Sequence, residues 1–503
     1  MKVMTSTVGQ GRRLHGLVLS GVLVALLATL FLEALDNTMV GPALPQIIRQ
    51  FQGTDRYSWV ATAYLLTSTI TIPIAGKFSD QFGRKWFLLG GAGVFLLGSL
   101  LCGAAQDMDQ LIAFRALQGL GSGIGITLVA TLIGDIFPAQ ERAKWQASVN
   151  IVYALANLLG PGLGGLVTDH GPLLASLVTE GTRWRWIFYL NIPLGLIAIT
   201  TLLIILPADI SERSLQSNGR SVLRNIDVSG ALLCGVATTC LLLGLSWGSD
   251  RTYAWTSPQV AGILATAIIG LLFFLWVEGH ASEPILPLRL FRNAIFAADT
   301  LLSLLVYMIL LGLSIYLPLF LQEVLGISAT DSGVSLSPFL ISITIGATLA
   351  GWLIAIRKRY QAIVLAGTLL MTLGVFFLMR MTPATTLWTA IIFMLMAGLG
   401  IGSIFSVLYL AVQNILPQNQ LGVGSAVVRY LGQLGSVLGV AIVGIVFSQS
   451  LASSGQKTKT TLTLALQHGF LAIFVFCLLA ILAVCFLKDT GSAQPSHQKP
   501  EGS

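Results

Sequence analysis

The stretch LVLSGVLVALLATLFLEALDNTMVGPAL (residues 17–44) decides the fold class of this chain. It is a nearly continuous apolar run, and a helix of about 20 apolar residues is long enough to cross a hydrocarbon core of about 30 Å. Similar runs follow one another as far as Leu487, with no polar stretch between them long enough to form a soluble domain. The chain is therefore predicted to be an all-α polytopic membrane protein.

The composition of the whole chain agrees with that prediction. Hydrophobic residues make up 55% of the chain and charged residues 10%, with a mean hydropathy of +0.83, whereas soluble domains carry about 25% charged residues. The runs are continuously apolar, unlike the alternating strands of a membrane barrel. We count roughly fourteen candidate helices by the length criterion. Their approximate bounds are 17–44, 57–76, 86–105, 109–133, 145–168, 186–206, 228–247, 258–278, 294–322, 332–356, 361–380, 385–411, 422–447 and 467–487.

The distribution of positive charge predicts the orientation in the membrane. A net charge of +7 would suggest nucleic acid binding in a soluble protein, but in a membrane protein an excess of Lys and Arg marks the cytoplasmic loops. With the N-terminus inside and an even number of spans, the basic clusters fall on the inner side. We therefore expect a multi-pass protein of the cell (inner) membrane with both termini cytoplasmic and no nucleic acid partner.

Two inner polar connections divide the helices into groups of six, two and six. They read PADISERSLQSNGRSVLRNID (residues 207–227) and EGHASEPILPLRLFRN (residues 278–293). The loops of the two larger groups share a weak trace of duplication, as in transporters built from repeated bundles. The predicted parts are an N-terminal six-helix bundle at 1–206, a cytoplasmic linker at 207–227, two additional transmembrane helices at 228–278, a cytoplasmic linker at 279–293, a C-terminal six-helix bundle at 294–487 and a disordered cytoplasmic tail at 488–503.

Polar groups inside apolar helices are costly to bury, so they are the first candidates for function. The first span carries Glu33 and Asp36, three residues apart and on nearly the same face of the helix. At 1.5 Å per residue, Asp36 lies roughly 12 Å from the outer end of the span, with Glu33 about one turn deeper. Burial and mutual repulsion oppose keeping both carboxyl groups charged. The pair is a candidate proton carrier, with permanent neutralisation by a structural arginine as the alternative.

Arg115, within LIAFRALQGLGSG (residues 111–123), is the candidate partner of these acids. It lies about 9 Å from the outer end of its span, at a depth similar to that of Asp36. We expect Arg115 to pair with the deprotonated acids and protonation to release it; a static ion pair is the alternative. A candidate second charge pair is matched in depth alone: Asp299 lies about 8 Å and Arg429 about 10 Å from the inner ends of their spans. For that pair, a structural salt bridge and a coupling site are equally favoured.

Two glycine-rich segments are expected to bring helices close together. ALANLLGPGLGGLVTD (residues 154–169) contains a proline, which bends a helix, among small residues, which permit close helix approach. Its candidate kink residues are Gly160, Pro161, Gly164 and Gly165. GLGSGIG (residues 119–125) resembles a dinucleotide-binding loop only superficially, because no strand precedes it, and packing is favoured.

The loop GKFSDQFGRK (residues 76–85) predicts a charge cluster at the inner mouth that latches one conformation. A cytoplasmic anchor explains its basic residues but not its aspartate or its two glycines. The latch residues are Gly76, Asp80, Gly83, Arg84 and Lys85. Four tyrosines lie away from the span ends and are candidates to line a pocket for a flat or cationic ligand, with core packing equally favoured. They are Tyr64, Tyr153, Tyr307 and Tyr409.

Together these segments resemble the major facilitator superfamily, and specifically its fourteen-helix drug:proton antiporter family, the multidrug efflux branch. LDNTMVGPALP (residues 35–45) looks like the first-helix signature of that branch, and GKFSDQFGRK looks like the loop signature of the superfamily. RALQGLGSG (residues 115–123) matches the proton-transfer motif. ALANLLGPGLGG (residues 154–165) matches the antiporter motif, with Ala156 where the family usually has glycine. RWRWIFYLNIPLG (residues 183–195) resembles the segment that enters the sixth helix.

The resemblance implies the major facilitator fold, with two six-helix bundles plus two inserted helices and alternating access. Members of the family export varied, often lipophilic and cationic compounds in exchange for protons. Carried over to this chain, Asp36 would be the carboxylate for substrate and proton, and Arg115 the motif arginine. Asp80 and Arg84 would form the conformational latch, and residues 160–161 the antiporter kink. Glu33 is outside the signature, so its role is inferred from its burial.

The sequence thus predicts a proton-coupled antiporter exporting amphipathic, often cationic, drugs or toxic compounds. We expect a monomer whose partners are small amphipathic substrates, protons and the lipid bilayer, with no metal and no cofactor beyond the proton gradient as energy source. An exporter of one physiological molecule, such as a lipid, siderophore or secondary metabolite, fits the same residues. A membrane-embedded enzyme is disfavoured because the sequence has no HExxH, nucleophile elbow or histidine cluster. An ATP-driven pump is disfavoured because no Walker segment is present.

Overall fold

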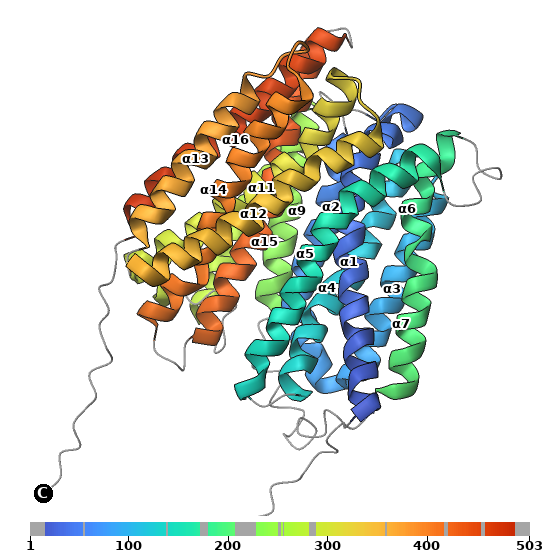
Figure 1. The fold of residues 1–503 in the computed structure, drawn as a ribbon, viewed down its shortest axis with the longest axis vertical. Coiled ribbons are helices and arrows are strands. Elements are labelled where there is room, and N and C mark those ends of the chain that lie inside the picture. The colour runs from blue at the N-terminus through green and yellow to red at the C-terminus, as the bar shows by residue number, and fades with distance from the viewer. Residues whose placement is uncertain are drawn as a thin grey trace, which may run out of the picture. The chain divides into compact units, whose positions relative to one another are not determined.

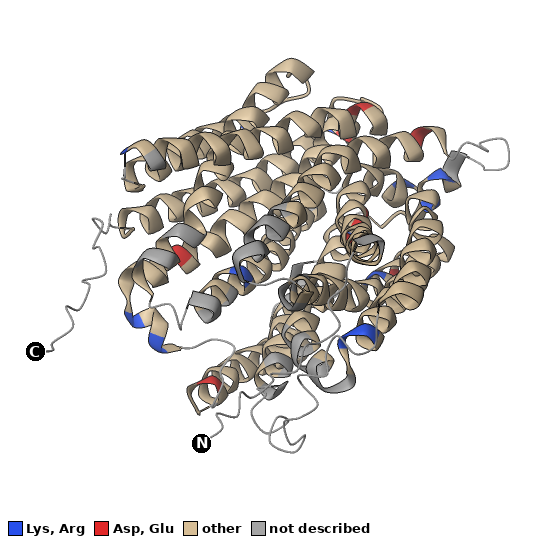
Figure 2. Ribbon diagram, turned by 60° about the horizontal axis from the view of Figure 1, so that its bottom comes forward, with Lys and Arg blue, Asp and Glu red and all other residues tan. Residues whose placement is uncertain are grey.

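The structure is a computed structural model that is helical almost throughout (Figure 1). No strand occurs among the residues it describes. Figure 2 shows long stretches of these helices with few charged positions. The described residues are 16–53, 56–136, 139–171, 180–206, 228–249, 253–254, 256–280, 288–357, 360–416, 421–453 and 458–487. The predicted linker at 207–227, residues 281–287 of the predicted linker at 279–293 and the predicted tail lie outside them.

The chain divides into two compact units. The first comprises Met1–Ile285 with Gly326–Ser337, and the second Leu286–Leu325 with Pro338–Ser503. The first unit therefore includes the two additional helices of the 228–278 segment.

The helices of the first unit begin with α1 and end with α10. In chain order they are α1 (Gly16–Phe51), α2 (Tyr57–Phe82), α3 (Arg84–Ala104), α4 (Met108–Ile136), α5 (Ala139–His170), the 3-10 helix η3 (Glu180–Arg185), α6 (Trp186–Tyr189), α7 (Asn191–Ile205), α9 (Val228–Ser249) and α10 (Pro258–His280).

The remaining helices run from η6 to α16. They are the 3-10 helix η6 (Leu288–Arg292), α11 (Ala294–Leu319), the π-helical turn η7 (Phe320–Val324), α12 (Ala329–Arg357), α13 (Gln361–Met379), α14 (Leu387–Ile415), α15 (Leu421–Ser453) and α16 (Lys459–Cys485). The first turns of α12 belong to the first unit, and the helix continues in the second unit from Pro338.

Twelve helices in the described part of the chain are long and apolar enough to cross a membrane. The prediction of an all-α polytopic membrane protein is therefore confirmed, whereas the count of fourteen spans is not. The two predicted segments outside the twelve form helices α2, of 26 residues, and α9, of 22 residues.

Several observed helices are longer than the predicted spans, because the predictions rest on hydropathy alone. The fifth span was predicted from residue 145, but α5 already begins at Ala139. Its first turns carry Glu141, Arg142 and Lys144, which are strong helix formers and can continue a helix beyond the hydrocarbon core. A polar helical turn is invisible to a search for apolar runs.

The glycines of α4 pack this helix closely against its neighbours, as predicted for GLGSGIG. A methyl group at Gly121 would overlap the backbone of α3 at Phe95, and one at Gly119 would overlap the backbone of α2 at Tyr64. A methyl group at Gly125 would overlap the Glu33 carboxyl group of α1. Close packing of α4 therefore holds the polar side chains of α1, α2 and α4 within reach of one another.

Candidate functional site

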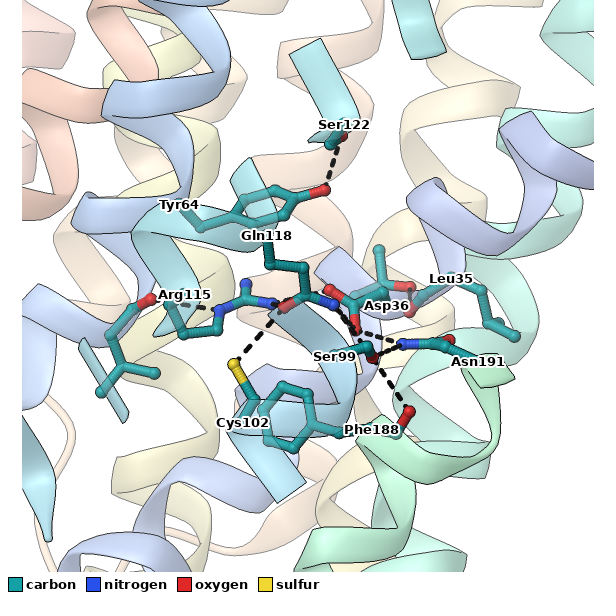
Figure 3. Close-up of polar contacts among 12 residues, drawn as sticks. Leu35, Asp36, Tyr64, Ser99, Cys102, Arg115, Gln118, Ser122, Phe188 and Asn191 are labelled. Atoms are coloured by element: carbon teal, nitrogen blue, oxygen red, sulfur yellow. Dashed lines mark hydrogen bonds and ion pairs between the residues drawn. The ribbon is translucent and has the colours of Figure 1, made fainter. Parts of the chain in front are cut away.

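Asp36 lies at the centre of a buried hydrogen-bond network in the first unit (Figure 3). Its residue is 1% exposed. One carboxylate oxygen accepts from Arg115 Nη1 at 2.6 Å, and the other accepts from Asn191 Nδ2 at 2.6 Å and from Gln118 Nε2 at 3.0 Å. Two side chains of α4 and one of α7 therefore donate to one carboxylate of α1.

Ser99 of α3 joins the two amides of this network. Its hydroxyl oxygen accepts from Asn191 Nδ2 at 2.8 Å and from Gln118 Nε2 at 3.1 Å. The same hydroxyl donates to the backbone carbonyl of Phe188 on α6 at 2.9 Å. Because a serine hydroxyl has one proton and two lone pairs, these three bonds use its full capacity.

Arg115 is 1% exposed, and its guanidinium group contacts several polar and aromatic groups of the protein. Its Nε donates to the carbonyl of Val60 on α2 at 3.3 Å, and its Nη1 also donates to Gln118 Oε1 at 2.8 Å. The guanidinium carbon lies 4.1 Å from the centroid of the Tyr64 ring, where a cation–π interaction is favourable. The Tyr64 hydroxyl in turn donates to Ser122 Oγ at 2.8 Å.

These contacts suit a charged Asp36–Arg115 pair. A buried ion pair is stable only with good geometry and with its remaining hydrogen-bonding groups satisfied, and Asp36 accepts from two amides besides Arg115. The depth estimate from the sequence placed the two residues at a similar level, and the structure brings them into contact.

Glu33 lies in a different environment one turn away on α1. Its residue is 2% exposed, and neither carboxyl oxygen has a hydrogen-bond partner among the residues described. It lies against Gly125 of α4, where no side chain could stand between them. Burying an ionised carboxylate without a partner is far more costly than burying the neutral acid. In this arrangement, Glu33 is suited to hold a proton.

The candidate second charge pair is not formed. Asp299 of α11 is fully buried, and both carboxyl oxygens are without a hydrogen-bond partner within the described part of the chain. Arg429 of α15 is exposed and makes no ion pair with it. Matched depth did not guarantee that the two side chains point toward each other.

The loop residues lie where α2 ends and α3 begins. Gly83 has a φ of 88°, a conformation that favours glycine. The Lys85 ammonium group donates to the carbonyl of Leu203 in the last turn of α7 at 2.8 Å, and Arg84 Nη1 donates to that of Thr131 on α4 at 3.4 Å. The Asp80 and Gly76 positions are part of α2, but the side chain of Asp80 lies outside what the structure describes.

The glycines of α5 form two rows along one continuous helix. Methyl groups at Gly160 and Gly164 would overlap α1 at Thr38 and Met39. A methyl group at Gly165 would overlap the backbone at the start of α12. Pro161 lies inside α5 without ending it.

The start of α12 is also bound by the end of α5. Asp169 accepts from the backbone N–H of Thr330 and from its hydroxyl, both at 2.6 Å, and from the backbone N–H of Ala329 at 3.4 Å. All three residues belong to the first unit. The antiporter-like segment therefore packs against α1 on one face and against the first turn of α12 on another.

The four candidate tyrosines do not share one environment. Tyr64 belongs to the Arg115 contacts, and Tyr153 packs beside an apolar cluster of α1, α3, α4, α5 and α7. Tyr307 packs edge-on against Phe405 at a centroid distance of 5.2 Å. The side chain of Tyr409 lies outside the described part of the structure. Among described residues, no three His, Cys, Asp or Glu side chains come together as a metal site.

Sequence reasoning did not single out Gln118, Asn191 or Ser99. Gln118 stands three residues after Arg115, and Asn191 lies in the RWRWIFYLNIPLG segment. An amide or hydroxyl in an apolar span was the available signal, because such groups need a partner when buried.

The comparison with known proteins assigns the family. The model of the Major Facilitator Superfamily matches residues 26–440. The chain belongs to this superfamily. It is a membrane transport protein and not an enzyme.

Relatives by sequence agree with this assignment, and solved structures share the fold. The chain is 35% identical to multidrug transporter protein MdtP of Bacillus subtilis (strain 168), over 86% of this chain and 75% of that protein. It is 33% identical to multidrug resistance protein 3 of the same organism, over 87% of this chain and 82% of that protein. A bacterial homologue of the human lysosomal transporter Spinster, in an inward-facing and occupied conformation, has the same fold. The TM-score is 0.67 at 16% identity, covering 94% of this chain and 97% of the other.

Proposed function

We propose that this chain is a proton-coupled antiporter that exports amphipathic, often cationic, drugs or toxic compounds by alternating access. The observation that carries the proposal is the contrast between two buried acids on α1. Asp36 is saturated by Arg115 and two amides, whereas Glu33 has no partner among the described residues. The names of the two bacterial relatives support the drug class of the substrate.

The charges of Glu33, Asp36 and Arg115 provide a route for exchange. With Glu33 neutral, the charges of Asp36 and Arg115 cancel. When Glu33 releases its proton to water, two carboxylates face one guanidinium, and the site carries one unbalanced negative charge. Electrostatic attraction is strong in a medium of low dielectric constant, so this charge favours binding of either a cationic substrate or another proton. Competition between the two at Glu33 exchanges one for the other.

Further parts of the proposal concern the cycle and the placement of the chain. The basic residues of the 76–85 loop act as the latch with Asp80, supported by the bonds of Arg84 and Lys85 to carbonyls of α4 and α7. The α5 segment acts as the antiporter kink. The chain is a fourteen-span monomer of the inner membrane with both termini cytoplasmic, as the distribution of Lys and Arg favours.

The proposal is tested with the purified protein in sealed liposomes under an imposed pH gradient, with ethidium as the fluorescent lipophilic cation. We expect the wild type to move ethidium in the direction opposite to the flow of protons down the imposed gradient. Glu33→Gln should abolish the response to the gradient, because its amide cannot release a proton. Asp109→Asn is the matched control, because Asp109 is an exposed carboxylate that pairs with Arg56 and takes no part in the buried network. This variant should transport ethidium as the wild type does.

Two results would change the proposal. Gradient-driven transport by Glu33→Gln would move the proton to another acid. No movement by the wild type would favour the second candidate, an exporter of one physiological molecule such as a lipid, siderophore or secondary metabolite.

A further inference from the structure

Asp299 is a buried acid that the exchange at Glu33 does not use. It lies in the second unit on α11, is fully buried, and has no hydrogen-bond partner on either oxygen among the described residues. The amides at the start of the helix are already bound by Asn293. The side chain of Asn293 accepts from Ile295 N at 2.9 Å and from Phe296 N at 3.4 Å. Asp299 is therefore not a helix cap.

The hydroxyl groups near Asp299 are also occupied. Thr300 Oγ1 donates to the carbonyl of Phe296 at 2.8 Å, and Ser303 Oγ donates to the carbonyl of Val428 on α15 at 2.9 Å. Each hydroxyl has a single proton to donate. Neither can stabilise a carboxylate at Asp299 without giving up its present bond.

No positive charge among the described residues neutralises Asp299. The elements packed against α11 are η6, η7, α14, α15 and α16, and α14 contains no charged residue. The basic groups of η6, α15 and α16 are exposed, and none forms an ion pair with Asp299. The acid of η7 follows the opposite end of α11 and adds no positive charge. The charged or titratable groups of these elements are Arg289, Arg292, Glu323, Tyr409, Arg429, Tyr430, Lys459, His468, Cys477 and Cys485.

These surroundings exclude a charged Asp299 in this conformation, since an isolated buried carboxylate is prohibitively costly. Among the described residues, a neutral Asp299 also has no hydrogen bond that would give it a structural role in this apolar helix. Ionisable residues inside spans are costly and mark ion or proton pathways. We propose that Asp299 is a second proton-binding carboxyl group, protonated in this conformation, whose proton is exchanged during transport. The exchange step rests on the proposed antiport; the proton-binding step does not.

Arg429 is the counter-ion for the unprotonated form. Arg429 follows Val428, whose carbonyl accepts a hydrogen bond from Ser303. Ser303 lies about one helical turn after Asp299 on α11. When the O–H bond of the acid breaks, its proton passes to water. The remaining carboxylate then needs a cation, and Arg429 is the basic residue of α15 nearest in sequence to that contact.

Proton binding is tested by infrared spectroscopy of the purified full-length protein in liposomes at neutral pH. We expect the wild type to show the C=O stretch of protonated carboxylic acids, which shifts in D₂O. Asp299→Asn should remove one component of this signal, and Glu33→Gln a different one. Asp299→Glu should retain a shifted component, and Asp109→Asn, with its exposed carboxylate, should change nothing. An Asp299→Asn spectrum identical to the wild type in this region would overturn the proposal.

Proton exchange is tested by the steady-state ethidium gradient as a function of the imposed pH gradient. Each coupled proton contributes one factor of ten per pH unit, so Asp299→Asn should lower accumulation about tenfold at a gradient of one unit. An unchanged slope in a correctly folded Asp299→Asn protein would overturn the exchange. If the wild type moves no ethidium, the proposed drug antiport fails, while the infrared result still decides whether Asp299 binds a proton.

Discussion

Asp36 in the first unit and Asp299 in the second are the same residue type, and both are buried in apolar helices, yet their surroundings are opposite. Asp36 receives hydrogen bonds from three side chains, one of them an arginine. Asp299 receives none from any described residue. Both lose the same hydration on burial, so the difference in their charge state comes from their partners. Burial alone therefore does not identify which acid carries a proton.

The largest expected effect comes from removing the cation of the first region. Arg115→Gln leaves Asp36 charged and buried with two neutral donors, so we expect the free energy of unfolding to fall by about 3–5 kcal/mol. Thermal unfolding of the purified protein in detergent measures this. The double variant Asp36→Asn/Arg115→Gln should lose less than the sum of the single variants, because the pair is coupled.

Arg56→Gln is the matched control for that experiment. Arg56 pairs with Asp109 at the surface, with side chains 50% and 74% exposed, and exposed pairs contribute about 0–1 kcal/mol. Equal losses for Arg115→Gln and Arg56→Gln would mean that the buried network does not stabilise Asp36 as described.

A smaller loss of stability is expected when Asp36 loses only one of its three hydrogen-bond donors, which makes its surroundings more like those of Asp299. Asn191→Leu removes the bonds to Asp36 and Ser99, and hydrogen bonds to charged groups are worth about 1.5–3 kcal/mol. Unfolding measurements should show a loss of that size. Thr201→Val, on the same helix, removes only a hydroxyl bonded to its own backbone at Ile197 and should change stability by less than about 0.5 kcal/mol.

The smallest effect is expected for Asp299→Asn. An uncharged acid without partners is replaced by an uncharged amide of the same shape, so the free energy of unfolding should change by less than about 1 kcal/mol. Asp36→Asn, by contrast, leaves Arg115 without its counter-charge and should lose several kcal/mol. A large loss in Asp299→Asn would show that Asp299 is charged and has a partner.

The sequence was sufficient for the fold class and the family resemblance, because runs of apolar residues and ordered motifs are local properties. It was less informative about which charges meet. Depth along a helix is one coordinate, and the direction in which a side chain points around the axis is another. Asp36 and Arg115 agree in both, whereas Asp299 and Arg429 agree in depth alone.

The amides of the network were missed for a related reason. Gln118 and Asn191 carry no charge, so they contribute little to a search for costly buried groups, and Asn191 lies on α7, far along the chain from Asp36. Their importance depends on the arrangement of α1, α3, α4 and α7, which close packing of glycines such as Gly121 establishes. Local sequence does not contain that arrangement.

The buried network also determines which helices can shift independently. It links α1, α3, α4 and α7 through side chains, α2 through the carbonyl of Val60 and α6 through the carbonyl of Phe188. Rotating any one of them breaks a hydrogen bond of this buried network, so we expect these six helices to move together. Helix α5 lies against α1 through Gly160 and Gly164 and through a hydrogen bond from Thr38 Oγ1 to the carbonyl of Ala156, none of which belongs to the network. In the first unit, we therefore expect the helices around Asp36 to keep their arrangement and α5 to be the helix that shifts relative to them.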